Sequence, residues 1–179
     1  MLLENANGPI RLPDFLIIGA MRCGTTSLFN YLAGHPELFL VSMRGSKEPQ
    51  FFSYFGESYS PHPPSIKANA WTLSDYVELS QNARPKQLIG DVSTSYLYRY
   101  RQSIKTIKKV YGSFASRLKI IAILRNPIER AWSIYMLKKQ GGDWNRPMLD
   151  IAREFQKDCS QDCYWNFISS GMYYEQIKA

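Results

Sequence analysis

Residues 15–32 constrain the fold of this chain more than any other stretch. Four apolar residues, Phe15 to Ile18, predict a buried β-strand, and Gly19 and Gly24 frame the loop that follows. Apolar residues then return at helical spacing until Gly34 ends the pattern. Glycines let backbone N–H groups turn inward, and a helix that begins there points its unpaired N–H groups at the loop. The stretch therefore predicts a strand, an anion-binding loop and a helix.

Strand and helix signals alternate through the rest of the chain. The segment from Leu118 to Leu124, which is continuously apolar after Lys119, is typical of a central parallel strand that is covered on both faces. Repeated alternation predicts a P-loop-like, three-layer α/β/α fold with a central, mainly parallel sheet. The other predicted strands are Leu38 to Val41 and Gln87 to Val92; the predicted helices are one with Leu28, Tyr31 and Leu32 on its apolar face, one opened by a Thr72–Asp75 capping box and running to about Gln81, one from Ile104 to Tyr111, and one from Pro127 to about Lys139.

Composition limits the partners of such a domain. The 179 residues with 45% hydrophobic content suit a single globular domain, residues 1–179. The formal charge of +7 favours an anionic partner but equally fits ordinary surface composition. Because the basic residues are scattered, apart from a solvated helical face at Lys105, Lys108 and Lys109, we expect no nucleic-acid partner.

The sequence shows neither a membrane anchor nor a disulfide framework. No apolar run approaches the roughly 18 residues of a membrane span, and residues 1–14 lack a signal-peptide pattern, so we expect a cytoplasmic protein. Cys23, Cys159 and Cys163 are too few for a disulfide framework. With only His35 and His62 to assist them, a zinc site is not expected either.

The first loop differs from the phosphate-binding loop of kinases. That loop, GxxxxGK[ST], places a lysine after its second glycine, whereas Thr25 stands there in this chain and Arg22 lies inside the loop. A kinase also needs an acidic residue for its metal at the end of a neighbouring strand, and the apolar run ends instead in Arg125. A nucleotide kinase is therefore the alternative prediction. The preferred prediction is a site that binds and transfers an anionic group without a metal ion.

Two segments resemble the sulfotransferases that use 3'-phosphoadenosine 5'-phosphosulfate (PAPS). PDFLIIGAMRCGTTSL (residues 13–28) resembles their 5'-phosphosulfate loop, and KIIAILRNPIERAWSIYM (residues 119–136) their 3'-phosphate motif. SKEPQFFSYF (46–55) and GDVSTSYL (90–97) are similar to the branch that includes heparan sulfate and other carbohydrate sulfotransferases and bacterial relatives. The resemblance implies PAPS as co-substrate, with the first loop binding its phosphosulfate through Arg22, Cys23, Gly24, Thr25, Thr26 and Ser27.

The second motif suits a separate phosphate. Arg125 follows the predicted strand and Ser133 lies on the second turn of the helix, so that a guanidinium and a hydroxyl converge on the 3'-phosphate. An exposed ion pair is the alternative for Arg125. Arg130 either belongs to the same site or pairs with Glu129 or Asp91.

The resemblance places a glutamate base at Glu48. A carboxylate within reach takes the proton that the acceptor loses, and Lys47 beside it stabilises the charge on the transferring group or leaving oxygen. Arg22, where the family commonly has lysine, retains the charge but cannot donate a proton. His62 is the rival base, and no metal is expected.

The acceptor is left open between a carbohydrate, a lipid and a small metabolite. An aromatic group between Phe51 and Trp71 either stacks on an acceptor or belongs to the core. The family continues beyond Tyr174 with further strands and a basic segment that closes over the nucleotide, so we expect the chain to be truncated at its C-terminus. A non-catalytic anion-binding module is the remaining alternative.

Overall fold

The computed structural model describes residues 2–5, 8–43, 47–56, 72–157 and 165–179. The strands are β1 (Leu2–Asn5), β2 (Gly8–Arg11), β3 (Phe15–Gly19), β4 (Leu38–Leu40), β5 (Leu88–Val92) and β6 (Lys119–Ala122). The helices are α1 (Thr25–Ala33), α2 (Phe51–Tyr54), α3 (Leu73–Glu78), α4 (Ser95–Tyr98), α5 (Tyr100–Tyr111), α6 (Pro127–Gln140), α7 (Met148–Lys157) and α8 (Tyr173–Lys178), with short 3-10 helices η1 (Gly112–Arg117) and η2 (Ser169–Gly171).

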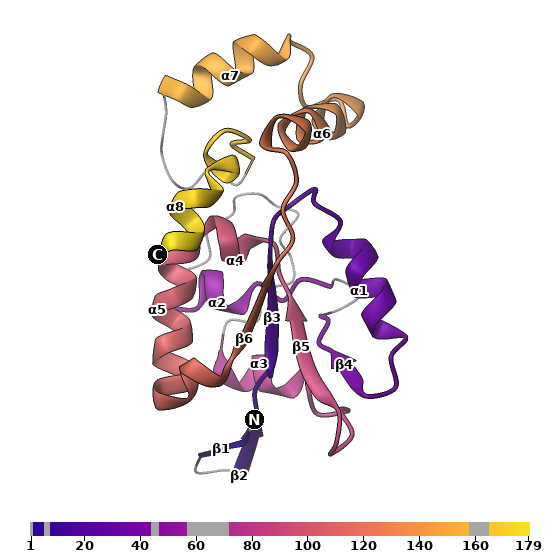
Figure 1. The fold of residues 1–179 in the computed structure, drawn as a ribbon, viewed down its shortest axis with the longest axis vertical. Coiled ribbons are helices and arrows are strands. Elements are labelled where there is room, and N and C mark those ends of the chain that lie inside the picture. The colour runs from indigo at the N-terminus through magenta and orange to yellow at the C-terminus, as the bar shows by residue number, and fades with distance from the viewer. Residues whose placement is uncertain (1, 6–7, 44–46, 57–71, 158–164) are drawn as a thin grey trace.

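A parallel sheet forms the centre of the molecule. Its order is β4-β5-β3-β6, and β1 pairs separately with β2 in an antiparallel ribbon. Figure 1 shows α1 on one side of this sheet and α4 and α5 on the other. The three layers and the parallel pairing confirm the predicted fold class.

β3 joins two cores because successive side chains of a strand point to opposite faces. Phe15 and Ile17 pack with the apolar side chains of α1 and β4. Leu16 and Ile18 pack instead with the aromatic core formed by α2, α3, α4 and α5. A strand that is covered on both faces needs a continuous apolar sequence, which is the pattern of this stretch.

The predicted apolar face of α1 was wrong at one position. Leu28 and Leu32 pack against the sheet, but Tyr31 is 79% exposed and Phe29 takes its place. With 3.6 residues per turn, Phe29 and Leu32 lie on the face of the helix that packs against the sheet, and Tyr31 points away from the sheet.

The prediction that β6 lies at the centre of the sheet was also wrong. β6 pairs with β3 alone among the described strands and forms an edge, with Ile120 51% and Ile121 39% exposed. The order of strands is decided by backbone pairing between segments far apart in the sequence, and an apolar run does not specify which strands lie beside it.

The first or last residues of some helices differ from the predicted ones. The Thr72–Asp75 capping box is present, but α3 ends at Glu78. α5 begins at Tyr100, four residues before the predicted start at Ile104, directly after the short helix α4. α6 begins at Pro127 as predicted, because the Asn126 side chain accepts hydrogen bonds from the first free N–H groups of the helix.

The strands of the parallel sheet end at one edge, and α6, α7 and α8 lie beyond it (Figure 1). Ala131, Ile134 and Tyr135 of α6 form a further core with Ile151 of α7 and Phe167. This core holds α6 close to the loop that follows β3.

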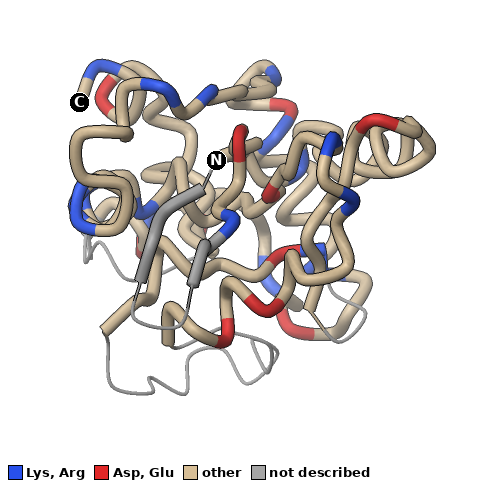
Figure 2. Tube along the Cα trace, turned by 90° about the horizontal axis from the view of Figure 1, so that it is seen from below, with Lys and Arg blue, Asp and Glu red and all other residues tan. Residues whose placement is uncertain are grey.

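Charged residues are distributed over several elements. Figure 2 shows Lys and Arg spread along the trace with Asp and Glu between them. Lys105, Lys108 and Lys109 of α5 are exposed, as predicted for a solvated face. Within the described ranges, no helix combines the length and the apolar character that a membrane span requires.

Candidate active site

A cavity of about 410 Å³ opens at the carboxyl edge of the sheet. It is lined by Met21, Arg22, Gly24, Thr25, Thr26, Lys47, Glu48, Thr94, Arg125, Ser133, Leu137 and Trp165. Residues predicted for the two phosphate sites and for catalysis therefore line one cavity, although they come from separate segments of the chain.

The loop between β3 and α1 bends at two left-handed residues. Gly24 has φ +94°, which glycine adopts without steric cost, and it caps the N-terminus of α1. Arg22 has φ +67°, a conformation rare for a residue with a side chain. From this position Arg22 Nε donates a hydrogen bond to Ser133 Oγ over 3.1 Å. The predicted phosphosulfate and 3'-phosphate residues are thus in direct contact.

Arg125 forms the exposed ion pair that was the alternative prediction for it. Its Nε donates to Glu129 Oε2 over 3.1 Å, and the two side chains are 42% and 62% exposed. Exposed pairs of this kind contribute about 0–1 kcal/mol. Because Arg125 also lines the cavity, its guanidinium can exchange the Glu129 carboxylate for a phosphate at little cost in free energy.

Lys47 and Glu48 also line the cavity. The Lys47 ammonium forms an ion pair with Glu48 Oε1. Glu48 Oε2 accepts hydrogen bonds from the Thr94 backbone N–H over 3.1 Å and from Thr94 Oγ1 over 2.8 Å. Both side chains of the ion pair are only 17% exposed, so the carboxylate is fixed in a largely water-free position.

Two predicted loop residues do not line this cavity. The Cys23 thiol points towards α8, with Sγ 3.6 Å from Tyr173 Oη, and Ser27 is exposed on α1. Burial and the hydrogen bond with Cys23 raise the pKa of Tyr173 to about 12. The side chains of the two residues are therefore placed differently from those of Thr25 and Thr26.

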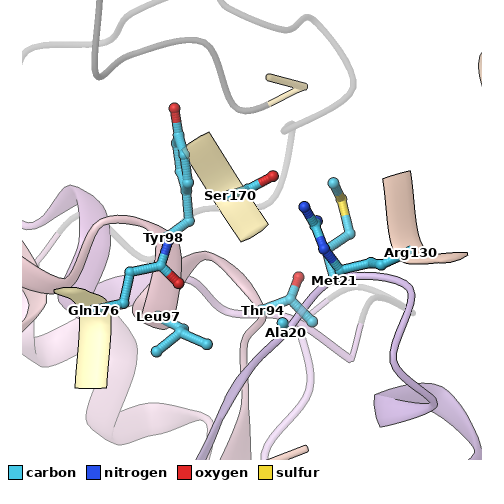
Figure 3. Close-up of a pocket in the computed structure, with 8 residues that line it drawn as sticks. All are labelled: Ala20, Met21, Thr94, Leu97, Tyr98, Arg130, Ser170 and Gln176. Carbon is cyan, nitrogen blue, oxygen red and sulfur yellow. The ribbon is translucent and has the colours of Figure 1, made fainter. Parts of the chain in front are cut away.

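Arg130 pairs with neither Glu129 nor Asp91. It is fully buried, and its Nη2 donates to the Phe167 carbonyl over 2.6 Å. In Figure 3 it reaches from α6 into a small cavity of about 10 Å³ that it shares with Thr94 and Ser170. Burial lowers the pKa of this guanidinium. Arg130 therefore lies behind the loop and does not line the larger cavity.

The aromatic group after β4 belongs largely to the core. Phe51 and Phe52 are 0% exposed, and Phe51 stacks on Tyr76 with ring centroids 4.2 Å apart. The rival base His62 lies outside the described residues, as do Tyr59 and Trp71 of the aromatic group and the cysteines Cys159 and Cys163.

Sequence reasoning missed two polar or aromatic residues that line the cavity. Thr94 is the second residue after β5, and a polar residue just beyond the end of a buried strand is a signal for this edge. Trp165 carried no such signal, because it reaches the cavity through the packing of the chain after α7. Lys138 Nζ lies 3.9 Å from its ring centroid.

Within the described ranges, no three His, Cys, Asp or Glu side chains gather as metal ligands would. Among the described residues that line the cavity, Arg22, Lys47 and Arg125 are the cations and Glu48 is the one acidic side chain. Parallel α/β proteins bind ligands at this edge of the sheet. Fold and cavity together define an α/β protein with a cationic cavity at the carboxyl edge of its parallel sheet.

Several known proteins are similar to the chain in sequence. The bovine bifunctional heparan sulfate N-deacetylase/N-sulfotransferase 2 is 30% identical over 135 residues, which are 74% of this chain and 14% of that protein. A membrane-associated sulfotransferase, kil1, of Dictyostelium discoideum is 30% identical over 148 residues, 80% of this chain and 27% of that protein. The chain thus spans a small part of the length of these relatives. No family model matches the chain.

A solved structure extends the likeness to three dimensions. The sulfotransferase of Alicyclobacillus acidocaldarius aligns with a TM-score of 0.77 and 27% identity, covering 94% of this chain and 68% of that one. The chain belongs to the sulfotransferase family, with heparan sulfate N-sulfotransferases and a bacterial enzyme among its relatives.

Proposed function

We propose that the protein transfers a sulfuryl group from PAPS to a hydroxyl or amine of an acceptor, with Glu48 as general base. The observation that carries the proposal is the common cavity, which collects the first loop, the Lys47–Glu48 pair and the Arg125–Ser133 motif. PAPS carries two separate anionic groups, and Arg22, Lys47 and Arg125 supply cations to the lining of the cavity.

The residues present fit such a donor. The loop from Met21 to Thr26 and the N-terminus of α1 offer backbone N–H groups and hydroxyls to the phosphosulfate. Arg125 and Ser133 are assigned to the 3'-phosphate. Arg22, bonded to Ser133, links the two anion sites.

The reaction forms one bond to sulfur and breaks another. An acceptor oxygen or nitrogen attacks sulfur, the bond from sulfur to the bridging phosphate oxygen breaks, and adenosine 3',5'-bisphosphate leaves with those electrons. The acceptor proton goes to Glu48, whose carboxylate is held by Thr94. Lys47 and Arg22 stabilise the negative charge that develops on the leaving oxygen.

Glu48→Gln tests the general base. The amide preserves the shape and removes the basicity, so turnover should fall about 100- to 10,000-fold while donor affinity changes little. Glu37→Gln is the matched control, because Glu37 is exposed and lies outside the cavity. Unchanged turnover in Glu48→Gln, with collapse in His62→Ala, transfers the base to His62.

Ligand binding separates the proposal from its alternatives. A sulfotransferase should be stabilised against heat by PAPS and adenosine 3',5'-bisphosphate, and a kinase by ATP with magnesium, since ligands that bind the folded state raise its melting temperature. Lack of a shift with all three favours a non-catalytic module.

Carbohydrate is the acceptor class that we propose to test first, because the relatives' names include heparan sulfate. A panel of carbohydrates, lipids and small metabolites, assayed with PAPS labelled in its sulfuryl group, distinguishes the three classes. Label in the lipid or metabolite arm alone overturns the carbohydrate assignment.

A further inference from the structure

A buried carboxylate lies behind the candidate active site, outside the lining of the cavity. Asp91 of β5 is 0% exposed. Its Oδ2 accepts hydrogen bonds from Tyr76 over 2.7 Å and Tyr96 over 2.6 Å, and its Oδ1 accepts one from Ser93 over 2.8 Å. None of the ion pairs of the described residues involves Asp91. Three hydroxyl groups therefore hold this carboxylate in place of a cation.

Asp91 determines the direction of the Ser93 hydroxyl. An ionised carboxylate only accepts hydrogen bonds, so the single Ser93 proton is directed at Asp91. The lone pairs of Ser93 Oγ are then free to accept the Gln50 backbone N–H, which lies 3.0 Å away. Ser93 thus connects the end of β5 to the segment that carries Glu48.

Gln50 needs this connection because of its backbone conformation. It has φ +56°, in the left-handed region that residues with side chains rarely adopt. Such conformations persist where surrounding contacts over-determine them, and they gather at functional sites. Only Pro49 separates Gln50 from Glu48 in the sequence.

Ser93 is connected to both partners of the contact between Glu48 and Thr94. Ser93 anchors Gln50 on the Glu48 side, and its chain neighbour Thr94 binds the Glu48 carboxylate. We propose that Asp91 and Ser93 are positioning residues, which hold Glu48 against Thr94 in the geometry that proton transfer requires. This role rests on the proposed function of Glu48.

Ser93→Ala tests the role, because it removes the connection and leaves the two tyrosine contacts of Asp91 in place. We expect turnover to fall about tenfold or more, since small misplacements of catalytic groups are costly, with the dissociation constant of adenosine 3',5'-bisphosphate changed less than about twofold. Tyr76→Phe is the matched control: it removes a buried hydroxyl bonded to Asp91 Oδ2 but does not touch Ser93 or Gln50. Equal turnover in the two variants overturns the proposal.

A double-mutant cycle separates positioning from a general loss of structure. If Ser93 acts through Glu48, Ser93→Ala added to Glu48→Gln should lower turnover less than about twofold further. A full tenfold loss in that background refutes the positioning role and leaves the proposed function intact. Full turnover in Glu48→Gln alone refutes the proposed function and the positioning role together. Ser93→Cys, which retains the size of the side chain and weakens both hydrogen bonds, replaces the alanine variant if that variant does not fold.

Discussion

The buried carboxylate of Asp91 predicts an unusual dependence of stability on pH. Burial raises its pKa from 3.8 to about 6, although the hydroxyl groups of Tyr96, Tyr76 and Ser93 act in the opposite direction. The negative charge of Glu48 raises it further. The pKa of Asp91 is higher in the folded than in the unfolded chain, so the folded state binds more protons between these two pH values. The stability that protonated Asp91 contributes is therefore fully present below about pH 4 and is lost as the pH rises through 6.

The size of this effect follows from the two pKa values. The shift from 3.8 to about 6 is roughly two units, and each unit corresponds to about 1.4 kcal/mol, so that Asp91 lowers the free energy of unfolding by about 3 kcal/mol at neutral pH. Asp91→Asn removes the titration. We therefore expect the free energy of unfolding of the variant, relative to the parent, to increase by about 2–3 kcal/mol between pH 4 and pH 7.5.

Urea unfolding of the two proteins at several pH values measures this difference. Other carboxylates titrate in both proteins and cancel in the comparison, which is why the difference is used and not the absolute stability. Asp143→Asn is the control, because Asp143 is 57% exposed and paired with Lys138 at the surface. The reasoning is refuted if the free energies of unfolding of Asp91→Asn and its parent depend on pH in the same way. It is also refuted if the variant becomes less stable relative to the parent as the pH rises above 6.

Further predictions concern the donor site, the metal and two elements of the fold. Arg125→Ala should weaken binding of adenosine 3',5'-bisphosphate by about 1.5–3 kcal/mol in calorimetry and leave adenosine 5'-phosphosulfate, which lacks the 3'-phosphate, unaffected; equal discrimination by both proteins contradicts the assignment. Turnover should survive EDTA, since cations of the cavity neutralise the transferring group, and a loss that magnesium restores indicates kinase chemistry. Gly90→Ala should destabilise the fold by about 3 kcal/mol in urea unfolding, because its Cβ would lie 2.2 Å from Phe15 Cζ; a neutral variant contradicts the packing. Thr72→Ala should cost about 1 kcal/mol in the same assay through loss of its hydrogen bond with the Asp75 N–H, and an unchanged midpoint argues against the cap.

Local signals predicted the elements that depend on neighbouring residues. The apolar run of β3 with Gly24 behind it, the Thr72 capping box and the start of α6 at Pro127 were all confirmed. In each case the hydrogen bonds or backbone angles involved lie within a few residues of one another. The family motifs in addition named residues that line one cavity, including Arg22, Glu48 and Ser133, whereas their roles stay predictions.

Contacts between distant segments decided the rest. The edge position of β6 follows from its pairing with β3, about a hundred residues away in the sequence. The buried guanidinium of Arg130 donates to the carbonyl of Phe167, 37 residues further along the chain, and not to Glu129 or Asp91. The network around Asp91 joins α3, α4 and β5 through hydroxyl groups that have no characteristic spacing in the sequence. A buried polar group takes whichever partner the packed core brings within reach, so its partner is determined by tertiary structure and cannot be read from the residues beside it.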